Sequence, residues 1–330
     1  MLRELPQRWT DAVVLALANG LAVLSHPGLA FRYVQKMRGW PLFATPRGHS
    51  AMVQWRKIFD RNPQFVLFCD KYRTKQWARE RDPEIALAEV VWTGTRPEDI
   101  PDEFLAPGYL LKANHGSGYN YFPHRKRWPR ERVERRFRHW LSRRFRGASE
   151  WAYWHVEPML HIERMLPLPL WEITFRCHDG VVSAFYVAID QKLASEHGNY
   201  FAASGERLPL AADDTESEDL PADFMLPPVF ATARRHAELL SQGVDYVRVD
   251  LMCVGDAVYF CEMTVYVGSG FGRENNSPAG ALIEKGWLGA IGVSWFLSTP
   301  QPWPLSLYAR AFQRWVQRRR QELGQPAQAD

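Results

Sequence analysis

Cysteine is scarce in this chain, and its spacing fits neither a metal site nor a disulfide framework. Four cysteines occur among 330 residues, at Cys69, Cys177, Cys253 and Cys261, and no pair has CxxC spacing. Each lies in an apolar segment of strand-like or helix-like pattern, which argues against zinc binding and against extracellular disulfides. The cytoplasm is therefore the expected location.

Long apolar runs are also lacking. The most apolar segment, residues 12–24 (AVVLALANGLAVL), is too short to span a bilayer. Asp11 directly precedes it, Asn19 interrupts it and no A-x-A cleavage site follows, so we expect a packed helix rather than an export signal. Arg3 and Arg8 at the N-terminus leave contact with a membrane surface open as an alternative.

Several familiar functional motifs are absent. The chain has no internal repeat, no GxSxG motif and no GxxxxGK[ST] loop. Ser117, in the HGSG segment, lacks the nucleophile-elbow pattern, so we set serine hydrolase chemistry aside. The missing Walker A order argues against a P-loop nucleotide site. No recognised nucleic-acid motif is present, and nucleic acid is not an expected partner.

The composition is globular, but its charge is uneven. Hydrophobic residues make up 46% of the chain and charged residues 24%, and the length allows two domains or one large α/β unit with sub-domains. The net charge of +4 conceals one strongly basic stretch, formed by Arg125, Lys126, Arg127, Arg130, Arg132, Arg135, Arg136, Arg138, Arg143, Arg144 and Arg146. Apolar residues recur at helical spacing across 132–145, so we interpret the arginines as the solvated side of an amphipathic helix.

The patterns of apolar residues and turn formers predict a mixed α+β or α/β chain. Residues 1–100 are expected to form an N-terminal, largely helical region, 101–166 a small sub-domain, 167–300 a large sub-domain and 301–330 a basic helix with a tail. Strands are expected at 86–93, 109–113, 160–163, 172–178, 181–190, 246–254 and 258–263. Helices are expected at 70–80, 231–242 and 307–323, and a polar loop at 192–219.

Charged residues recur inside two otherwise core-like strands near the C-terminus. Asp250 lies two residues after Arg248, and Glu262 lies in the following strand. Burying a lone carboxylate is costly, whereas two carboxylates and an arginine suit a magnesium–phosphate site, in which metal and phosphate neutralise each other. A purely structural Arg–Asp pair with an edge-strand glutamate explains the pattern equally well at this point.

The register of these two strands gives a test of the metal hypothesis. A regular two-residue turn at Gly255 and Asp256 would pair Asp250 with Cys261 and place Glu262 on the opposite face. A three-residue turn or a bulge would bring Asp250 and Glu262 together. The metal hypothesis therefore predicts one of these two irregularities.

Lys112 is a second candidate, because it lies in an apolar strand directly before a glycine-containing turn. The turn contains His115, Gly116, Ser117 and Gly118, and its backbone N–H groups are suited to bind phosphate oxygens. An ordinary hairpin turn remains the alternative.

The order of these motifs resembles the ATP-grasp superfamily, and in particular its TupA-like branch, which is associated with cell-surface polysaccharide synthesis. The resemblance covers roughly residues 55–275. The segments that carry it are Asp70-Lys71-Tyr72, the run from Leu111 to Gly118 (LKANHGSG), Glu150-Trp151 with Tyr153, Arg248-Val249-Asp250-Leu251, and Glu262 to Gly272 (EMTVYVGSGFG). Thr264 stands where many related ligases have asparagine.

The resemblance implies an ATP-grasp fold, in which two α+β sub-domains enclose ATP, and a set of site residues. Lys71, Lys112 and the loop from His115 to Gly118 would contact the phosphates, while Glu163, Arg164 and Leu166 would hold ribose and adenine. Asp250 and Glu262 would bind Mg2+, and Arg248 would stabilise the transferring phosphoryl group. Where the family has a DYK-like triplet, this chain has Glu172-Ile173-Thr174, so Arg176 or Lys192 would have to replace its lysine.

The resemblance also implies a reaction. Related ligases phosphorylate a carboxylate to an acyl phosphate that an amine then attacks, with release of ADP and phosphate. Gly268, Ser269 and Gly270 would assist the second step, and the substrate would be a uronic acid or amino acid of a surface glycan. Two alternatives remain open: a kinase that acts on a sugar hydroxyl, and a scaffold that binds the membrane surface and glycan machinery through residues 125–146 and the C-terminal helix.

Overall fold

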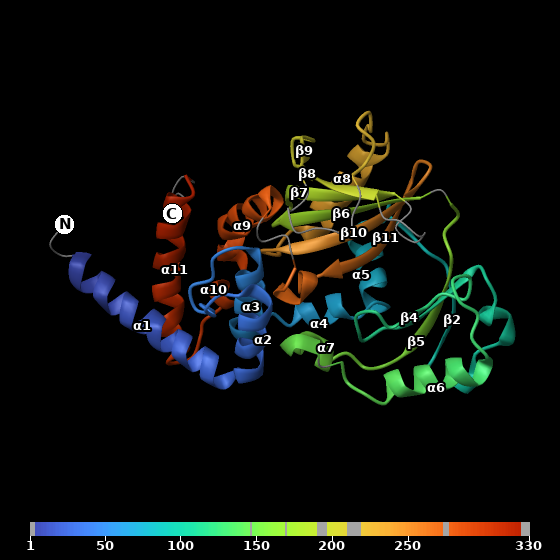
Figure 1. Cartoon of the computed structure of the whole chain (residues 1–330), viewed down its shortest axis with the longest axis horizontal. Coiled ribbons are helices and arrows are strands. Elements are labelled where there is room, and N and C mark those ends of the chain that lie inside the picture. The colour runs from blue at the N-terminus through green and yellow to red at the C-terminus, as the bar shows by residue number, and fades with distance from the viewer. Residues whose placement is uncertain are drawn as a thin grey trace.

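The structure, a computed structural model, describes residues 4–145, 147–168, 170–189, 197–209, 219–272 and 277–324. It contains a seven-stranded and a four-stranded sheet, each with its own hydrophobic core, and a group of helices from both ends of the chain (Figure 1). Lys192, Arg146, the tail at 325–330 and part of the loop expected at 192–219 lie outside the described residues, so those expectations stay predictions.

The large sheet has the strand order β1-β11-β10-β6-β7-β8-β9. Its strands are β1 (Ala86–Leu87), β6 (Trp171–His178), β7 (Val181–Ile189), β8 (His197–Ala202), β9 (Arg207–Leu208), β10 (Val247–Val254) and β11 (Ala257–Thr264). All neighbours are antiparallel except β1 and β11. The β6–β7 hairpin turns at Asp179 and Gly180, as expected, and both have positive φ, which is typical of two-residue hairpin turns.

The two faces of the large sheet differ in chemistry. On one face, helix α8 (Phe230–Ser241) packs Phe230 against Phe175 and Phe185. Side chains alternate between faces along a strand, so Arg248 and Asp250 lie on the other face from the buried residues Val247, Val249, Leu251 and Cys253. Burial of the alternate apolar residues therefore fixes which face carries the charged groups.

The small sheet has the order β2-β5-β3-β4 and is antiparallel throughout. Its strands are β2 (Val90–Gly94), β3 (Tyr109–Ala113), β4 (Asn120–Tyr121) and β5 (Leu160–Arg164). Helix α6 (Arg130–Leu141) buries Val133, Phe137 and Trp140 against it, as its apolar pattern predicts. Arg130 and Arg138 form ion pairs with carboxylates at the surface, which agrees with the interpretation of a solvated arginine face.

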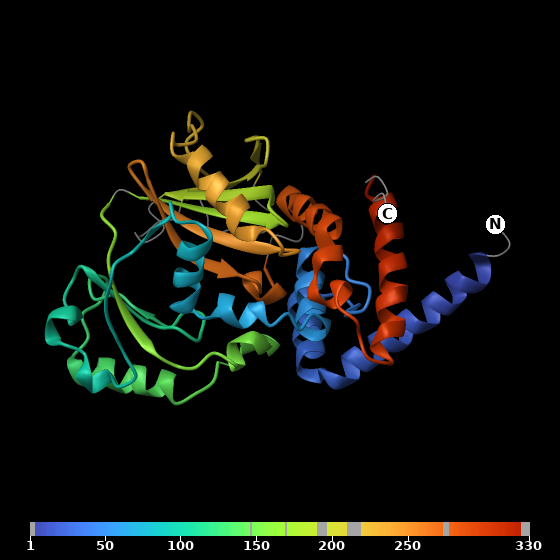
Figure 2. The ribbon, with the colours of Figure 1, turned by 180° about the vertical axis from the view of Figure 1, so that it is seen from behind.

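Helices from the two chain ends pack together at the end of the molecule opposite the small sheet (Figures 1 and 2). They include α1 (Glu4–Ser25), α2 (Pro27–Met37), α3 (His49–Phe59), α10 (Trp295–Ser298) and α11 (Leu305–Glu322). Helix α1 packs against α11, and Arg314 of α11 donates hydrogen bonds of 2.6–3.1 Å to Asp11. Helices α4 (Gln64–Cys69), α5 (Arg73–Arg81) and α7 (Trp151–Trp154) connect this group to the sheets (Figure 2).

Among the described residues, no single helix has the length and apolar character needed to cross a membrane. Only α1 and α2 taken together, as Gln7–Ser25 and Pro27–Met37, satisfy that test, and they are bent by 99° with respect to each other.

Two sequence expectations differ from the structure. Strands β8 and β9 occupy part of the segment expected to be a polar loop, because Tyr200 and Phe201 of β8 pair with Tyr186 and Phe185 of β7 across the sheet. Strand β2 lies in the small sheet although it precedes residue 101, so the chain enters the small sheet earlier than the expected boundary. All four cysteines are free thiols, as expected.

Candidate functional site

The β10–β11 hairpin has the irregular register that the metal hypothesis requires. Its turn is regular, with Val254 opposite Ala257, but the register shifts between Asp250 and Leu251, where Cys261 is the extra residue. Asp250 therefore lies directly opposite Glu262, as predicted for a bulged hairpin. Both carboxylates consequently occupy the same face of the large sheet.

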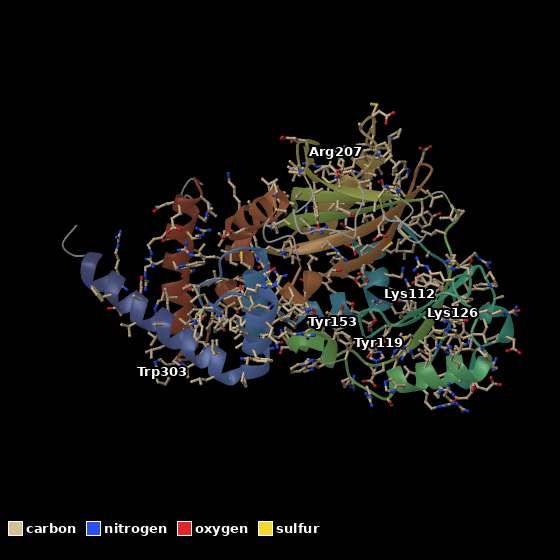
Figure 3. The ribbon with its side chains drawn as sticks, viewed as in Figure 1. Lys112, Tyr119, Lys126, Tyr153, Arg207 and Trp303 are labelled. Atoms are coloured by element: carbon tan, nitrogen blue, oxygen red, sulfur yellow. The ribbon has the colours of Figure 1, made fainter. Side chains whose placement is uncertain are left out.

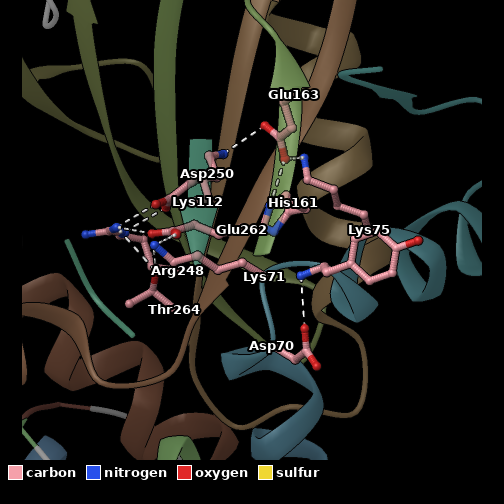
Figure 4. A network of polar contacts seen from close by, with 11 residues as sticks. Asp70, Lys71, Lys75, Lys112, His161, Glu163, Arg248, Asp250, Glu262 and Thr264 are labelled. Carbon is pink, nitrogen blue, oxygen red and sulfur yellow. Dashed lines mark hydrogen bonds and ion pairs between the residues drawn. The ribbon is translucent and has the colours of Figure 1, made fainter. Parts of the chain in front are cut away.

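Arg248 connects this pair of carboxylates (Figure 4). Its Nε donates a hydrogen bond of 2.6 Å to Oδ1 of Asp250, and one terminal nitrogen lies 3.5 Å from Oε1 of Glu262. Thr264 donates a hydrogen bond of 3.3 Å to the same oxygen of Glu262. The Thr264 hydroxyl thus orients Glu262. Thr264 itself stands at the position where related ligases have asparagine.

Charge and burial give the two carboxylates different protonation behaviour. Burial raises the pKa of Asp250 to about 7, and Arg248 only partly opposes this effect. Burial also tends to raise the pKa of Glu262, but Lys71, whose Nζ lies 3.8 Å from Oε2, and Arg248 outweigh it and lower that pKa to about 2. Burial thus favours the neutral form of Asp250, and a cation bound beside it would favour the ionised form that a metal ligand needs.

A second ionic cluster is centred on Glu163 of β5 (Figure 4). Nζ of Lys112, on the adjacent strand β3, lies 2.8 Å from Oε2 of Glu163. On the other oxygen, Oε1, Nζ of Lys75 lies at 3.1 Å and Nε2 of His161 at 3.3 Å. Both oxygens of Glu163 therefore have protein partners, and its expected contact with ribose stays a prediction.

The lysines determine the ionisation state of this buried cluster. Burial alone would raise the pKa of Glu163, but Lys112 and Lys75 hold it well below its usual range. Burial tends to lower the pKa of Lys112, and the Glu163 carboxylate more than compensates, so that pKa is raised. Burial lowers the pKa of His161. Lys112 is thus a permanently charged group at the edge of the cleft described next.

A cleft of about 620 Å³ lies between the two sheets and brings both clusters together. Its volume is in the range of small-molecule and cofactor sites. Its polar part is lined by Lys71, Lys75, Lys112, Glu163, Asp250 and Glu262, and its apolar part by Ala88, Leu110, Leu166, Leu168, Leu170 and Met252. Arg164 also lines the cleft, with its guanidinium bonded to Glu89 at 2.6 Å. One half is suited to polyphosphate and cations, and the other to a flat apolar ring.

The glycine turn follows Lys112 but lies outside the cleft lining. The ring of His115 is buried and makes hydrogen bonds of 3.0 and 3.2 Å with the carbonyls of Trp140 and Arg143. This anchors the turn to the end of α6, so the His115 ring serves a structural role here. None of the residues from His115 to Gly118 lines the cleft, and phosphate binding by their backbone N–H groups stays a prediction.

The turn is also joined to the start of α5, which explains why two distant motifs occur together. Nδ2 of Asn114 donates to Oδ1 of Asp70 at 3.1 Å, and the backbone N–H of Lys71 donates to the carbonyl of Asn114 at 3.1 Å. The same oxygen of Asp70 accepts hydrogen bonds from the backbone N–H groups of Tyr72 and Arg73, which caps the helix start. Lys71 and Lys112 are thereby held in one rigid unit.

Arg176 lies beside Arg248, its direct neighbour across the β6–β10 pair. One guanidinium nitrogen donates a hydrogen bond of 2.6 Å to Oγ1 of Thr174, and another donates a hydrogen bond of 2.8 Å to the hydroxyl of Tyr200. The guanidinium therefore lies against Thr174, the position at which the DYK-like triplet of the family has its lysine. Arg176 is buried and does not line the cleft, so its predicted nucleotide contact stays a prediction.

Gly268, Ser269 and Gly270 form a left-handed turn near the cleft, since all three have positive φ. Nζ of Lys57 donates a hydrogen bond of 2.7 Å to the carbonyl of Ser269, and Nε2 of Gln54 donates one of 2.7 Å to the carbonyl of Gly270. The hydroxyl of Ser269 donates to the carboxylate of Glu150. The Glu150-Trp151 and GSGFG segments of the predicted motif series thus meet through one side-chain contact.

Sequence reasoning missed Lys75, His161 and Lys57, and it named Glu150 without giving it a role. Two of these carried a usable signal, because Lys75 lies four residues after Lys71 along a helix and His161 lies two residues before Glu163 on a strand. Both spacings place residues on a common side. Lys57 and Glu150 meet Ser269 only through tertiary packing. In the described part of the chain no three His, Cys, Asp or Glu side chains converge, so a metal at Asp250 and Glu262 needs phosphate oxygens or water as further ligands.

Comparison with known proteins assigns the chain to a family. A family model described as TupA-like ATPgrasp matches residues 51–283, which is more than half of the chain. This confirms the predicted family, the ATP-grasp fold class and the interpretation of the chain as an ATP-grasp enzyme. No curated protein matches the chain.

Solved structures resemble the chain only weakly. The macrocyclase MdnC from Microcystis aeruginosa, bound to the precursor peptide MdnA, has 15% identity and a TM-score of 0.36, and the match covers 63% of this chain and 55% of the macrocyclase. A D-alanine–D-alanine ligase from Bacillus anthracis complexed with ATP has 15% identity and a TM-score of 0.38, with 78% of this chain and 68% of the ligase covered.

Proposed function

This chain belongs to the TupA-like ATP-grasp family, and on that premise we propose that it is an ATP-dependent carboxylate–amine ligase. Its substrate would be a uronic acid or an amino acid, free or linked to a glycan, in the synthesis of a cell-surface polysaccharide. The observation that carries the proposal is the bulge that sets Asp250 opposite Glu262 on the wall of a cleft whose other side carries Lys112.

The residues of the cleft fit magnesium and a nucleotide. Two carboxylates on one face supply hard oxygen ligands for Mg2+. The pKa of Asp250 is raised chiefly by burial and further by Glu262, and a bound divalent cation would favour the ionised form of both carboxylates. Lys71 and Lys112 would bind the phosphates, and Leu166 with the apolar wall would hold the adenine. When bound, magnesium and ATP supply an electrophilic phosphoryl group with its charge partly neutralised.

The remaining groups would position the acceptor and stabilise charge. Arg248 is oriented by Asp250 and Glu262, so its guanidinium can face an oxyanion at little reorganisation cost. In the proposed reaction, the substrate carboxylate takes a phosphoryl group to give an acyl phosphate, and an amine then displaces phosphate to form an amide. Ser269 and its flanking glycines would contact the acceptor from the turn held by Lys57 and Gln54.

The test is an ADP-release assay with ATP, magnesium and pools of uronic acids and amino acids, followed by mass spectrometry of the products. A ligase should release phosphate only when a carboxylate and an amine are both present, and the product should gain an amide. The Asp250→Asn variant is the control and should be inactive. Transfer of phosphate to a stable product would instead support a kinase that acts on a sugar hydroxyl.

A complete absence of nucleotide binding would overturn the proposal. A ligand that binds only the folded state raises the apparent stability, so magnesium-ATP should increase the thermal midpoint of the protein. If it does not, a scaffold of the glycan machinery becomes the better interpretation. A cytoplasmic location belongs to the proposal, because ATP is supplied there.

A further inference from the structure

Helix α1 has a row of large apolar side chains that face away from the molecule. Trp9, Val13, Leu17, Leu21 and Leu24 follow one another at spacings of four, four, four and three residues, and each is 55–77% exposed. These spacings place them on one side of the helix. Exposed apolar rows of this length are uncommon on monomeric proteins and mark interaction sites.

The exposed row cannot be an inner face that has failed to pack. The opposite side of α1 carries Asp11, Leu15 and Ala22, which are all buried. That side contacts α11, and the ion pair between the buried Asp11 and the partly exposed Arg314 fixes its orientation. Helix α1 is therefore apolar on two sides, and only one of them packs against other described residues.

Exposed apolar side chains also follow α1 along the chain. Phe31 and Val34 of α2 are 66% and 44% exposed, and Trp40 and Leu42 in the following segment are 73% and 45% exposed. Trp303, before α11, is 79% exposed and projects beside α1 in Figure 3. We call the set Trp9, Val13, Leu17, Leu21, Leu24, Phe31, Val34, Trp40 and Leu42 the α1–α2 apolar face. Tryptophan is enriched where a protein meets the interface between lipid and water.

The charged residues that α1, α2 and the following segment expose after residue 7 are all basic. Between residues 7 and 48, the only acidic residue is Asp11, which is buried and paired with Arg314. The same segment exposes Arg8, Arg32, Lys36 and Arg38. Basic residues beside an exposed apolar face are complementary to a surface of anionic phospholipid headgroups. A second copy of this chain would instead bring the same basic groups face to face, which is unfavourable.

We propose that the α1–α2 apolar face docks on an anionic phospholipid bilayer, with α1 and α2 lying in the interface and not crossing it. The bend of 99° between the two helices turns the chain within the plane or back from it, and neither helix spans a bilayer by itself. This surface differs from the basic helix α6 and from the solvated side of α11. The face lies at the end of the molecule opposite the small sheet (Figures 1 and 2).

The experiment is flotation of the full chain with vesicles of phosphatidylcholine alone or with about one third phosphatidylglycerol. The wild-type chain should float with the anionic vesicles and much less with the neutral ones. Leu17→Glu combined with Leu21→Glu should reduce the bound fraction about ten-fold or more, because two apolar side chains leave the interface. Arg32→Glu combined with Lys36→Glu should abolish the difference between the two vesicle types.

Matched controls keep the outcome interpretable. Val181 and Met225 are 63% and 83% exposed outside this face, so Val181→Glu and Met225→Glu should leave flotation unchanged. Circular dichroism and the response to magnesium-ATP would check that each variant is folded.

Equal flotation of the wild-type chain and of the double variant Leu17→Glu with Leu21→Glu would overturn the proposal. So would a wild-type dimer in sedimentation that this variant dissociates, because a second copy would then be the occupant. The inference does not depend on the ligase activity.

Discussion

The ammonium group of Lys112 lies 2.8 Å from Oε2 of Glu163, on the neighbouring strand of the small sheet. Because Lys75 of α5 contacts the other oxygen of the same carboxylate, Glu163 joins the small sheet to the helix that follows Lys71. Glu163 and Lys75 are almost fully buried and Lys112 is only slightly exposed, so removing one charge leaves others without compensation.

Glu163→Gln should therefore be strongly destabilising. We expect a loss of about 3–5 kcal/mol in the free energy of unfolding, because two ammonium groups would remain buried without their carboxylate. Urea denaturation followed by fluorescence measures this change. Glu89→Gln is the matched control, since Glu89 pairs with Arg164 at the surface and its loss should cost about 1 kcal/mol or less. Equal losses in both variants would show that the cluster is not a buried network.

Lys112 and Lys75 contact the same carboxylate but should differ in nucleotide binding. Lys112→Met and Lys75→Met each leave Glu163 with one lysine, so their stabilities should fall by similar amounts. If Lys112 binds phosphate, its loss should weaken magnesium-ATP binding about ten-fold or more, while Lys75→Met should weaken it less. Isothermal titration calorimetry gives both affinities. Equal losses of affinity would assign a phosphate contact to Lys75 as well.

The sequence predicted the parts of this site that local pattern determines. The apolar alternation around Arg248 and Asp250 defined β10, and the two-residue turn at Gly255 and Asp256 made a bulge necessary for any contact with Glu262. The structure contains that bulge. The hairpin at Asp179 followed from the preference of such turns for residues that tolerate positive φ.

The parts that were missed depend on contacts between distant segments. Lys75 reaches Glu163 only after α5 packs beside the small sheet, and Glu150 reaches Ser269 only after α7 packs beside the left-handed turn. The sequence left the role of residues 1–55 open, because an apolar helix has the same sequence pattern whether its outer side is covered or exposed. Only the packing of α1 on α11 distinguishes its two apolar sides.

The metal hypothesis makes a direct prediction for the two carboxylates. Asp250→Asn and Glu262→Gln should each remove the magnesium-dependent part of the stabilisation by ATP, because each removes a charged oxygen ligand. Thermal shift titrations with magnesium at fixed ATP measure this effect. Cys261→Ser is the matched control, because Cys261 is the bulged residue and lines the same cleft. Unchanged magnesium dependence in Asp250→Asn would contradict the assignment.

The left-handed turn at Gly268 to Gly270 should be more sensitive to alanine at Gly270 than at Gly268. A Cβ at Gly270 would lie 2.3 Å from Nε2 of Gln54 and 2.9 Å from the carbonyl oxygen of Ser50, whereas a Cβ at Gly268 would meet nothing within 4 Å. Both positions have positive φ, which costs alanine about 1–2 kcal/mol.

Gly268→Ala should therefore lose about 1–2 kcal/mol of unfolding free energy, and Gly270→Ala clearly more, because it also displaces Gln54 or the backbone at Ser50. Chemical denaturation of both variants compares them directly. Since the turn does not line the cleft, magnesium-ATP affinity should change in neither. A stability of Gly270→Ala equal to that of Gly268→Ala would show that the turn relaxes without cost.

The last prediction concerns pH and rests on Asp60, which is fully buried at the end of α3. Burial and the nearby carboxylate of Asp245 raise the pKa of Asp60 to about 8, although Arg56 acts in the opposite direction. The ordinary aspartate pKa of 3.8 applies to the unfolded chain. Between these two values the folded state holds a proton that the unfolded state releases, so the free energy of unfolding should decrease as the pH rises.

The slope from this one group is at most about 1.4 kcal/mol per pH unit, and it should vanish in Asp60→Asn, whose side chain does not titrate. Urea denaturation between about pH 5 and about pH 7, each about one unit inside the interval between the two pKa values, would measure it. Asp223→Asn removes an exposed carboxylate and should keep the wild-type slope. Parallel curves for Asp60→Asn and wild type would show that Asp60 is ionised in the folded protein, with Arg56 as its counter-charge.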